Sequence, residues 1–240
     1  MAKRRNLILT ACLLANVARA ESLAEIVERA VAAAGGKARL AAVRSERMTG
    51  TIAFGTDLPA PFVLELKRPG KIRAEITFRK GPFVQAFDGK VGRVISPFTE
   101  PAAHQMGPLE TRDIAESADM DGPLVDSKAR GIVVELLGKE DVEGKPAWKL
   151  RVRRKSGSVR TLFLDAASYL KVKWAGAIGE PGKEVVHETL FDDYRAVDGI
   201  PFSHRLRSHS SGGGQAQEIV LSKIELNPVI EDARFGVPGS

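Results

Sequence analysis

The feature that most constrains the fold of this chain is a change in hydrophobic period near Glu46. Before it, apolar residues recur every three or four positions, as on one face of a helix. After it, apolar and polar residues alternate in short runs, as in strands that bury one face. Asp88-Gly89 and Asp198-Gly199 are strong turn signals between such runs. The runs indicate eleven or twelve strands, at residues 48–54, 62–66, 72–78, 83–87, 91–95, 132–137, 147–153, 159–164, 169–178, 184–194, 200–209 and 218–226.

Helical patterns occur at the start and in the middle of the chain. Ser22 and Glu25 form an S-x-x-E capping box, and an apolar stripe follows until a glycine pair ends the helix. A second short helical piece is predicted at residues 37–43. Residues 109–120 predict the middle helix, and the proline-containing segment 96–108 before it predicts a long loop.

Strands that are joined by short turns, with no crossover helices, favour one antiparallel sheet over a parallel βαβ array. A sheet of about 11 strands is long enough to curl, and its apolar face needs a cover. The helices are the segments that supply one. We therefore predict an α+β fold: a strongly curved antiparallel sheet, an incomplete barrel, with helices on its concave face, in a single domain that spans residues 21–240.

The first twenty residues have the layout of a secretory signal peptide. A basic start at residues 3–5 precedes an apolar run at 7–17, and Ala18-Arg19-Ala20 is an A-x-A cleavage site. The apolar run is too short to span a membrane, which takes about 20 residues. Four of the 36 basic residues and none of the 30 acidic ones lie here, so the rest of the chain has 32 basic and 30 acidic residues. Cleavage after Ala20 would thus lower the net charge from +6 to +2.

Cleavage would also remove Cys12, the one cysteine of the chain. The mature protein would then contain no disulfide, thiolate nucleophile or cysteine-ligated metal. Two alternatives stay open at this stage. Arg4-Arg5 loosely resembles a twin-arginine export signal, and residues 9–12 resemble a lipobox that would anchor the chain through Cys12. We expect cleavage after Ala20 and a location in the periplasm.

Residues 149–155 form the most basic stretch of the chain. Alternation places Lys149, Arg151 and Arg153 on one face of a strand and apolar residues on the other. Aromatic residues for base stacking are not interleaved with them, and the charge of the mature chain is near neutral. We therefore predict no nucleic-acid partner, and anionic lipid head groups or an acidic partner stay open as alternatives for this stretch.

Motifs for catalysis or metal binding are weak. The sequence has no G-x-S-x-G elbow, and its histidines lie in no triad context: His104, His187, His204 and His209. His187-Glu188 lacks the second histidine of H-E-x-x-H, and residues 119–126 match a calcium loop only faintly. We predict no catalytic residue, no metal site and no cofactor.

The apolar face of the sheet is the remaining candidate for function. The chain has ten Phe against two Trp and two Tyr, and Phe brings no polar group that needs a partner. Such a face is either filled by its helices or lines a cavity for an apolar ligand. The candidate lining residues are Ile52, Phe54, Phe62, Leu64, Ile76, Phe78, Trp148, Leu150, Trp174 and Phe202.

The sequence also resembles a known family. It is similar to bacterial outer-membrane lipoprotein-sorting proteins of the LolA-like superfamily, over residues 22–238 and most closely to a poorly characterised branch. The segments that carry the resemblance are Asp121-Gly122-Pro123-Leu124-Val125-Asp126, Val134 through Gly144, Phe163-Leu164-Asp165, Phe191-Asp192-Asp193-Tyr194-Arg195, Gly199-Ile200-Pro201-Phe202 and Asn227-Pro228 through Asp232 to Phe235. The resemblance implies a half-open antiparallel barrel closed by helices, around a cavity that receives acyl chains in the periplasm. It carries over no catalytic motif and no acyl-binding motif.

The leading hypothesis is a monomeric periplasmic carrier or chaperone that sorts lipoproteins or lipids to the outer membrane, with acyl chains as its ligand. Each acyl CH₂ removed from water contributes about 0.8 kcal/mol to such binding. The alternative is an envelope sensor of the same fold that binds a membrane protein partner. A hydrolase is less favoured, because it would require a polar cluster inside the cavity.

Overall fold

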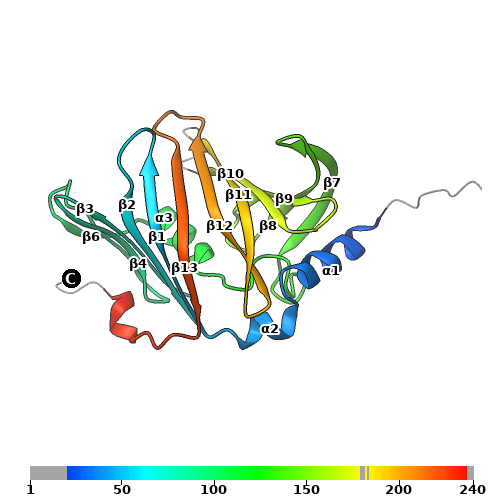
Figure 1. Cartoon of the computed structure of the whole chain (residues 1–240), viewed down its shortest axis with the longest axis horizontal. Coiled ribbons are helices and arrows are strands. Elements are labelled where there is room, and N and C mark those ends of the chain that lie inside the picture. Colours follow the sequence, from blue (N-terminus) through cyan, green and yellow to red (C-terminus); the bar gives the residue numbers. More distant parts are fainter. Residues whose placement is uncertain (1–20, 179–181, 183, 237–240) are drawn as a thin grey trace, which may run out of the picture.

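The structure is a computed structural model that describes residues 21–178, 182 and 184–236. The predicted signal peptide, its cleavage site and Cys12 therefore lie outside the described residues. Within them, the strands form one antiparallel sheet, accompanied by three α-helices and a 3-10 helix (Figure 1). The strands are β1 (Ser45–Phe54), β2 (Ala60–Lys67), β3 (Lys71–Phe78), β4 (Gly81–Phe87), β5 (Gly92–Ile95), β6 (Ala103–Gln105), β7 (Val133–Val142), β8 (Lys145–Arg153), β9 (Val159–Asp165), β10 (Lys171–Ile178), β11 (Val185–Val197), β12 (Ile200–Ser210) and β13 (Gln217–Leu226).

The strand order is β6-β5-β4-β3-β2-β1-β13-β12-β11-β10-β9-β8-β7. Strands that follow one another in sequence are paired, with the exception of β6 and β7, and β1 pairs with β13 in the middle of the sheet. The two edge strands, β6 and β7, do not pair with each other in the described part of the chain. The sheet is open, so the predicted class, a curved antiparallel sheet that is an incomplete barrel, is confirmed.

The pairing of β1 with β13 contains a bulge, and the register shifts between Thr49 and Gly50. A Cβ atom at Gly50 would lie 2.0 Å from the carbonyl oxygen of Val220. Because that neighbour is a backbone atom and cannot move aside, glycine is required at this point, where the first strand pairs with the last.

The predicted strand count was slightly low, because about 11 strands were expected and the described residues form thirteen. The predicted loop at residues 96–108 contains β6, which pairs with β5 through Arg93 and Gln105. All three residues of β6 are exposed, so this strand has no buried face and shows no alternation. The middle helix, α3 (Pro108–Ser117), ends earlier than predicted, because the chain turns at Ala118 and Asp119.

The N-terminal helix confirms its sequence signals. In α1 (Leu23–Ala33), the Glu25 amide donates to Ser22 Oγ at 3.3 Å and the Ser22 amide donates to Glu25 Oε2 at 2.7 Å, which completes the capping box. The predicted second piece is α2 (Lys37–Ala42). Among the helices of the described residues, none is long and apolar enough to cross a bilayer.

Cross-strand partners in an antiparallel sheet place their side chains on the same face. Leu66 is paired with Ile72, and Ile72 with Phe87, and these three side chains contact the end of α3. Residues in register with them across the sheet define the inner face, on which α1 and α3 both pack. Their sequence neighbours define the outer face.

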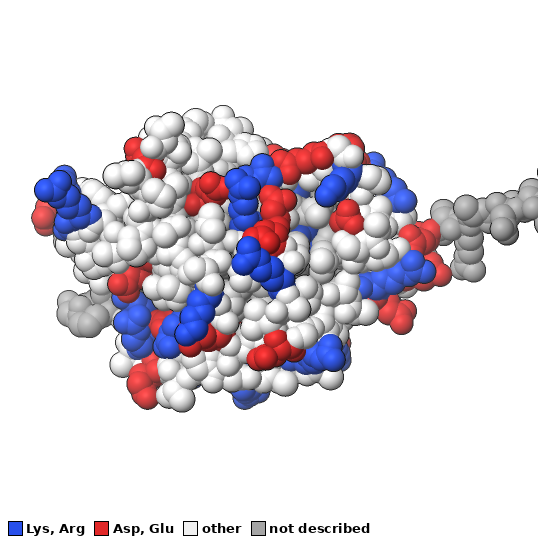
Figure 2. Space-filling model, in the orientation of Figure 1, with Lys and Arg blue, Asp and Glu red and all other residues white. Residues whose placement is uncertain are grey.

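The outer face carries intermingled basic and acidic side chains (Figure 2). On β8, for example, Lys149 pairs with Glu140 at 2.7 Å and Arg151 with Glu135 at 3.3 Å. The predicted alternation of β8 is therefore confirmed, since its apolar residues are buried on the other side. The outer face is also partly covered by the C-terminal 3-10 helix η1 (Asp232–Phe235), which contacts β3.

Candidate functional site

The ten residues predicted to line a cavity all lie on the inner face, but in two different environments. Trp148, Leu150 and Trp174 belong to a cluster beneath α1, at the β7 end of the sheet (Figure 1). The other seven lie on β1, β2, β3 and β12: Ile52, Phe54, Phe62, Leu64, Ile76, Phe78 and Phe202. The structure thus brings together seven of the ten and separates three from them.

The cluster beneath α1, here called the α1 cluster, has eight buried residues at its centre and a rim of half-buried ones that includes Trp174. Leu150 is 0% exposed, and Ile26 and Ala30 of the helix pack against it together with Trp148 and Leu162. Burying each large apolar side chain here contributes about 1.5–3 kcal/mol to folding. The three candidate lining residues at this end therefore contact protein.

The α3 cluster covers the opposite end of the inner face. Leu66, Ile72 and Phe87 are buried there against Ala118, and Ile114 of α3 packs on the same group. The helix contacts β3, β4 and β5. Both ends of the sheet are thus covered by a helix on the inner side.

The middle of the inner face is different. Only Ile52, Phe62, Leu221 and Ile224 are buried in its cluster, which we call the central inner face. The apolar side chains around them are only half-buried: Met48, Phe54, Ala60, Leu64, Ala74, Ile76, Val197, Phe202, Leu206, Ile219 and Leu226. Within the described residues, none of the cluster's members comes from a helix. The result is an extended apolar surface that the chain leaves partly exposed to water.

Aromatic rings extend the central inner face along the strand direction, beyond the C-terminal end of β1. Phe54 and Phe78 have ring centroids 6.0 Å apart, and Phe98 packs on Phe78 edge-on at 5.2 Å. Such edge-to-face pairs add about 0.5–1.5 kcal/mol beyond the area that they bury. Phe98 is nevertheless 55% exposed, so this rim is accessible.

A charged group lies where the central inner face meets the α3 cluster. Glu46 is buried on the inner face of β1, and burial raises the pKa of its carboxyl to about 7, although Arg68 opposes the shift. Arg68 forms a bidentate pair with Asp121 at 2.6 and 2.7 Å. Its remaining donors reach the carbonyls of Val43 at 2.8 Å and Leu40 at 3.1 Å. Arg68 therefore ties the β2–β3 turn to α2 and to the segment after α3.

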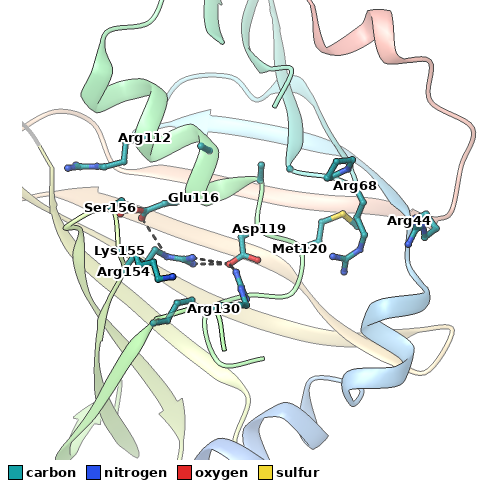
Figure 3. Close-up of a pocket in the computed structure, with 15 residues that line it drawn as sticks. Arg44, Arg68, Arg112, Glu116, Asp119, Met120, Arg130, Arg154, Lys155 and Ser156 are labelled. Carbon is teal, nitrogen blue, oxygen red and sulfur yellow. Dashed lines mark hydrogen bonds and ion pairs between the residues drawn. The ribbon is translucent and has the colours of Figure 1, made fainter. Parts of the chain in front are cut away.

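A large cleft opens beside this group, between the segment after α3 and the turns that follow β2 and β8 (Figure 3). Its volume is about 760 Å³. Six of the lining side chains are cationic: Arg44, Arg68, Arg112, Arg130, Arg154 and Lys155. Only two are anionic, Glu116 and Asp119. We call this hollow the basic cleft.

The centre of the basic cleft is a network of paired charges (Figure 3). Two guanidinium nitrogens of Arg154 donate to Asp119 at 3.0 Å, and Arg130 donates to the same oxygen at 2.6 Å. Glu116 accepts from the hydroxyls of Ser156 and Ser158, each at 2.6 Å. This network holds α3 and the segment after it against the end of β8, because its members come from both.

His187 and His204 lie on the inner face away from the helices, whereas His209 lies opposite Glu188 on the outer face. His204 is buried, and its Nδ1 lies 2.9 Å from the carbonyl oxygen of Leu221. His187, whose pKa is lowered chiefly by burial, lies 3.0 Å from the hydroxyl of Ser210, beside a small polar hollow of about 220 Å³. Within the described part of the chain, no three His, Cys, Asp or Glu residues gather as metal ligands would.

The basic cleft has no counterpart among the features predicted from the sequence. Its cations are scattered from Arg44 to Lys155, on five separate segments, so no run of basic residues marks them. The most basic stretch, residues 149–155, contributes only its last two members, at the end of β8. Arg68 directly follows β2 and Arg154 directly follows β8. In a strongly curved sheet the turns at such strand ends can meet, and this is the signal from which these two cations could have been predicted to lie together.

Solved structures share this architecture. A scan against models of protein families finds no match, and neither does a search of the curated proteins. A domain named for outer membrane lipoprotein sorting, from Vibrio parahaemolyticus, is 13% identical and superposes with a TM-score of 0.58 over 88% of this chain and 94% of its own. A DUF1329 family protein from Desulfovibrio piger is 16% identical and superposes with a TM-score of 0.59 over 88% of this chain and 95% of its own.

A LolA superfamily protein from Nitrosomonas europaea is 13% identical, with a TM-score of 0.57 over 91% of this chain and 99% of its own. These likenesses cover nearly the whole of each neighbour. They confirm that the chain has a LolA-like fold, which agrees with the resemblance seen in the sequence.

Proposed function

We propose that this protein binds the acyl chains of lipoproteins or lipids on the central inner face and acts as a periplasmic carrier or chaperone on their way to the outer membrane. The observation that carries the proposal is the incomplete cover of that face. Eleven apolar side chains stay half-buried between two helix-covered ends. An acyl chain laid there would remove them from water and gain about 0.8 kcal/mol for each of its own CH₂ groups.

Two further features support this assignment. The neighbours in fold include a domain named for outer membrane lipoprotein sorting, and the first twenty residues have the pattern of an export signal. We propose that binding involves no catalysis and no cofactor. The inner-face His204 lies on a backbone carbonyl, and the acids of the basic cleft are engaged by arginines and serines.

The test uses the exported chain stripped of bound lipid, titrated with an N-palmitoylated peptide and with the same peptide lacking the acyl chain. We expect saturable binding of the acylated peptide alone. Ile219→Asn places an amide on the central inner face, and Val220→Asn places one on the outer face of the same strand, where Val220 is already 45% exposed. The first change should weaken binding at least tenfold and the second should leave it unaltered.

Absence of saturable binding, or equal effects of the two variants, contradicts the proposal. Recovery of one stable protein partner from envelope extracts, together with no acyl binding, would instead establish the sensor alternative. Thermal melting of both variants verifies that the fold is intact.

A further inference from the structure

The basic cleft has more positive charge than its own acids neutralise. Four of its cations are paired: Arg68 with Asp121 at 2.6 Å, Arg112 with Asp113 at 3.2 Å, and Arg130 and Arg154 with Asp119 at 2.6 and 3.0 Å. Glu116, at 3.7 Å from Arg154, is the fourth acid of the group. Arg160, which lies behind the lining, also faces Asp113 and Glu116 at 3.2 and 3.7 Å.

Arg44 and Lys155 are the two lining cations whose side chains form no ion pair among the described residues. Both are exposed, and Figure 3 shows them on opposite sides of the cleft, Arg44 near Arg68 and Lys155 near Arg154. Each side of the cleft therefore offers an anion one cation that need not give up a partner to bind it.

The backbone around both cations is fixed. The Arg44 amide donates to the Asn227 side chain at 2.6 Å, and its carbonyl accepts from the Arg68 amide at 2.9 Å. The stem of Lys155 passes over Gly131. Gly131 has a φ of +68°, a left-handed backbone conformation that favours glycine. The cleft is thus a formed feature of the fold.

The apolar part of the cleft lining connects it to the central inner face. Ala118 and Met120 line the cleft and belong to the α3 cluster. Leu64 packs against that cluster and also against the central inner face. On the other side, Ile132 lines the cleft and belongs to the α1 cluster. A molecule with its polar end in the cleft can therefore continue onto apolar surface.

We infer that the basic cleft is the head-group site of the protein's ligand and binds the phosphate of an anionic amphiphile, which the unpaired charges of Arg44 and Lys155 attract from the two sides of the cleft, while the acyl chain lies on the central inner face. This inference rests on the proposed function for its apolar half. A phosphodiester matches the site because it spreads one negative charge over oxygens that accept from both guanidinium and ammonium donors. The cleft, at about 760 Å³, has room for a head group of this size.

The test compares three probes on the lipid-free protein by calorimetry below the micelle concentration. Lysophosphatidylglycerol is anionic, lysophosphatidylcholine has the same acyl chain with a zwitterionic head, and glycerol 3-phosphate has no acyl chain. Arg44→Gln with Lys155→Gln removes the two unpaired cations. Arg79→Gln with Lys145→Gln is the matched control, since it removes one exposed Arg and one exposed Lys at turns outside the cleft lining.

We expect the unaltered protein to bind lysophosphatidylglycerol about tenfold more tightly than lysophosphatidylcholine, which corresponds to about 1.4 kcal/mol. The cleft variant should bind both equally, through the acyl chain, and the control variant should keep the preference. The preference should also shrink as salt is raised.

A preference that is missing in the unaltered protein, or that survives in the cleft variant, overturns the inference and leaves the proposed function standing. If neither lysophospholipid binds, the proposed function fails. If, in that case, glycerol 3-phosphate binds the unaltered protein and not the cleft variant, the cleft is a site for free phosphate esters. This outcome also overturns the head-group assignment.

Discussion

The two ends of the sheet and its middle are built from the same kinds of residue, yet they differ in how completely the inner face is covered. At the β8–β9 end, Leu150 and Leu162 are 0% and 3% exposed beneath α1. In the middle, Leu206 and Ile219 face the same side and remain half-buried. Alternation along a strand fixes which face is apolar. Which part of that face is covered depends on where the helices pack, and in this protein α1 and α3 pack at the two ends of the sheet.

This difference implies that stability and ligand binding are located in different parts of one sheet. A packed end contributes to folding whether or not a ligand is present. A half-covered middle contributes less to folding and keeps apolar surface available.

The largest expected effect is loss of core packing at the α1 end. Leu150→Ala removes a fully buried side chain and leaves a cavity, so it should lower the free energy of unfolding by about 2–5 kcal/mol. Leu206→Ala, in the half-covered middle, should cost about 1 kcal/mol, because water already reaches that side chain and no closed cavity results. Urea unfolding of both variants gives the comparison.

Equal losses from the two substitutions would mean that the middle is packed as tightly as the ends, and the acyl-binding surface would lose its basis. The acyl-binding assay completes the comparison. Leu206→Ala should weaken binding, whereas folded Leu150→Ala protein should bind as the unaltered protein does.

The next effect concerns Glu46, which lies at the boundary between the middle and the α3 end. Its pKa is raised by burial from 4.5 to about 7, so between these values the folded protein binds more protons than the unfolded chain. The stability associated with this group is therefore fully present below pH 4.5 and is lost as the pH rises through 7. A shift of this size corresponds to about 3 kcal/mol.

Glu46→Gln should remove that dependence, because a neutral amide has no proton to lose. Unfolding free energies of the variant and the unaltered protein, measured from pH 4.5 to 8, should diverge with rising pH in favour of the variant. Parallel curves would show that Glu46 is not kept from ionising by its surroundings. Arg68 and Asp121 are the charged groups that influence the pKa of Glu46, and both are retained in the variant.

Much of the fold was predictable because alternation, turn signals and the capping box are local properties of the sequence. β8 is an example, since Lys149 and Arg151 face outward and Trp148 and Leu150 inward as the pattern requires. β6 was not predictable, because a three-residue edge strand with no buried face has no pattern.

The candidate site was only partly predictable for a related reason. Alternation identified inner-face residues such as Phe62 and Phe202, and it identified Leu150 equally well, since it carries no information on where α1 packs. The basic cleft combines Arg44, Arg68 and Lys155 from distant segments, and only the curvature of the sheet brings them together. Whether the ten predicted residues line a ligand cavity stays a prediction.

A smaller effect is expected from Arg68, which ties the covered α3 end to α2. Arg68→Lys keeps the positive charge but cannot pair with Asp121 in two parallel bonds while also reaching the carbonyls of Val43 and Leu40. Loss of these bonds should cost about 1–2 kcal/mol. It should also raise amide hydrogen exchange in residues 118–131 more than in β8 or β9. Uniform exchange throughout would show that Arg68 does not hold that segment.

The smallest effect is expected at an exposed pair between the same two segments. Lys37 of α2 lies 2.7 Å from Asp126, and their side chains are 63% and 46% exposed. Exposed pairs contribute about 0–1 kcal/mol and are screened by salt, so Asp126→Asn should lower stability by less than about 0.5 kcal/mol at low salt and by nothing measurable in 1 M salt. Asn also tolerates the left-handed backbone at this position, where φ is +50°, so the substitution removes the charge without adding strain. A loss larger than that of Arg68→Lys would place the main link between α2 and the segment after α3 on the surface, not at the buried edge of the inner face.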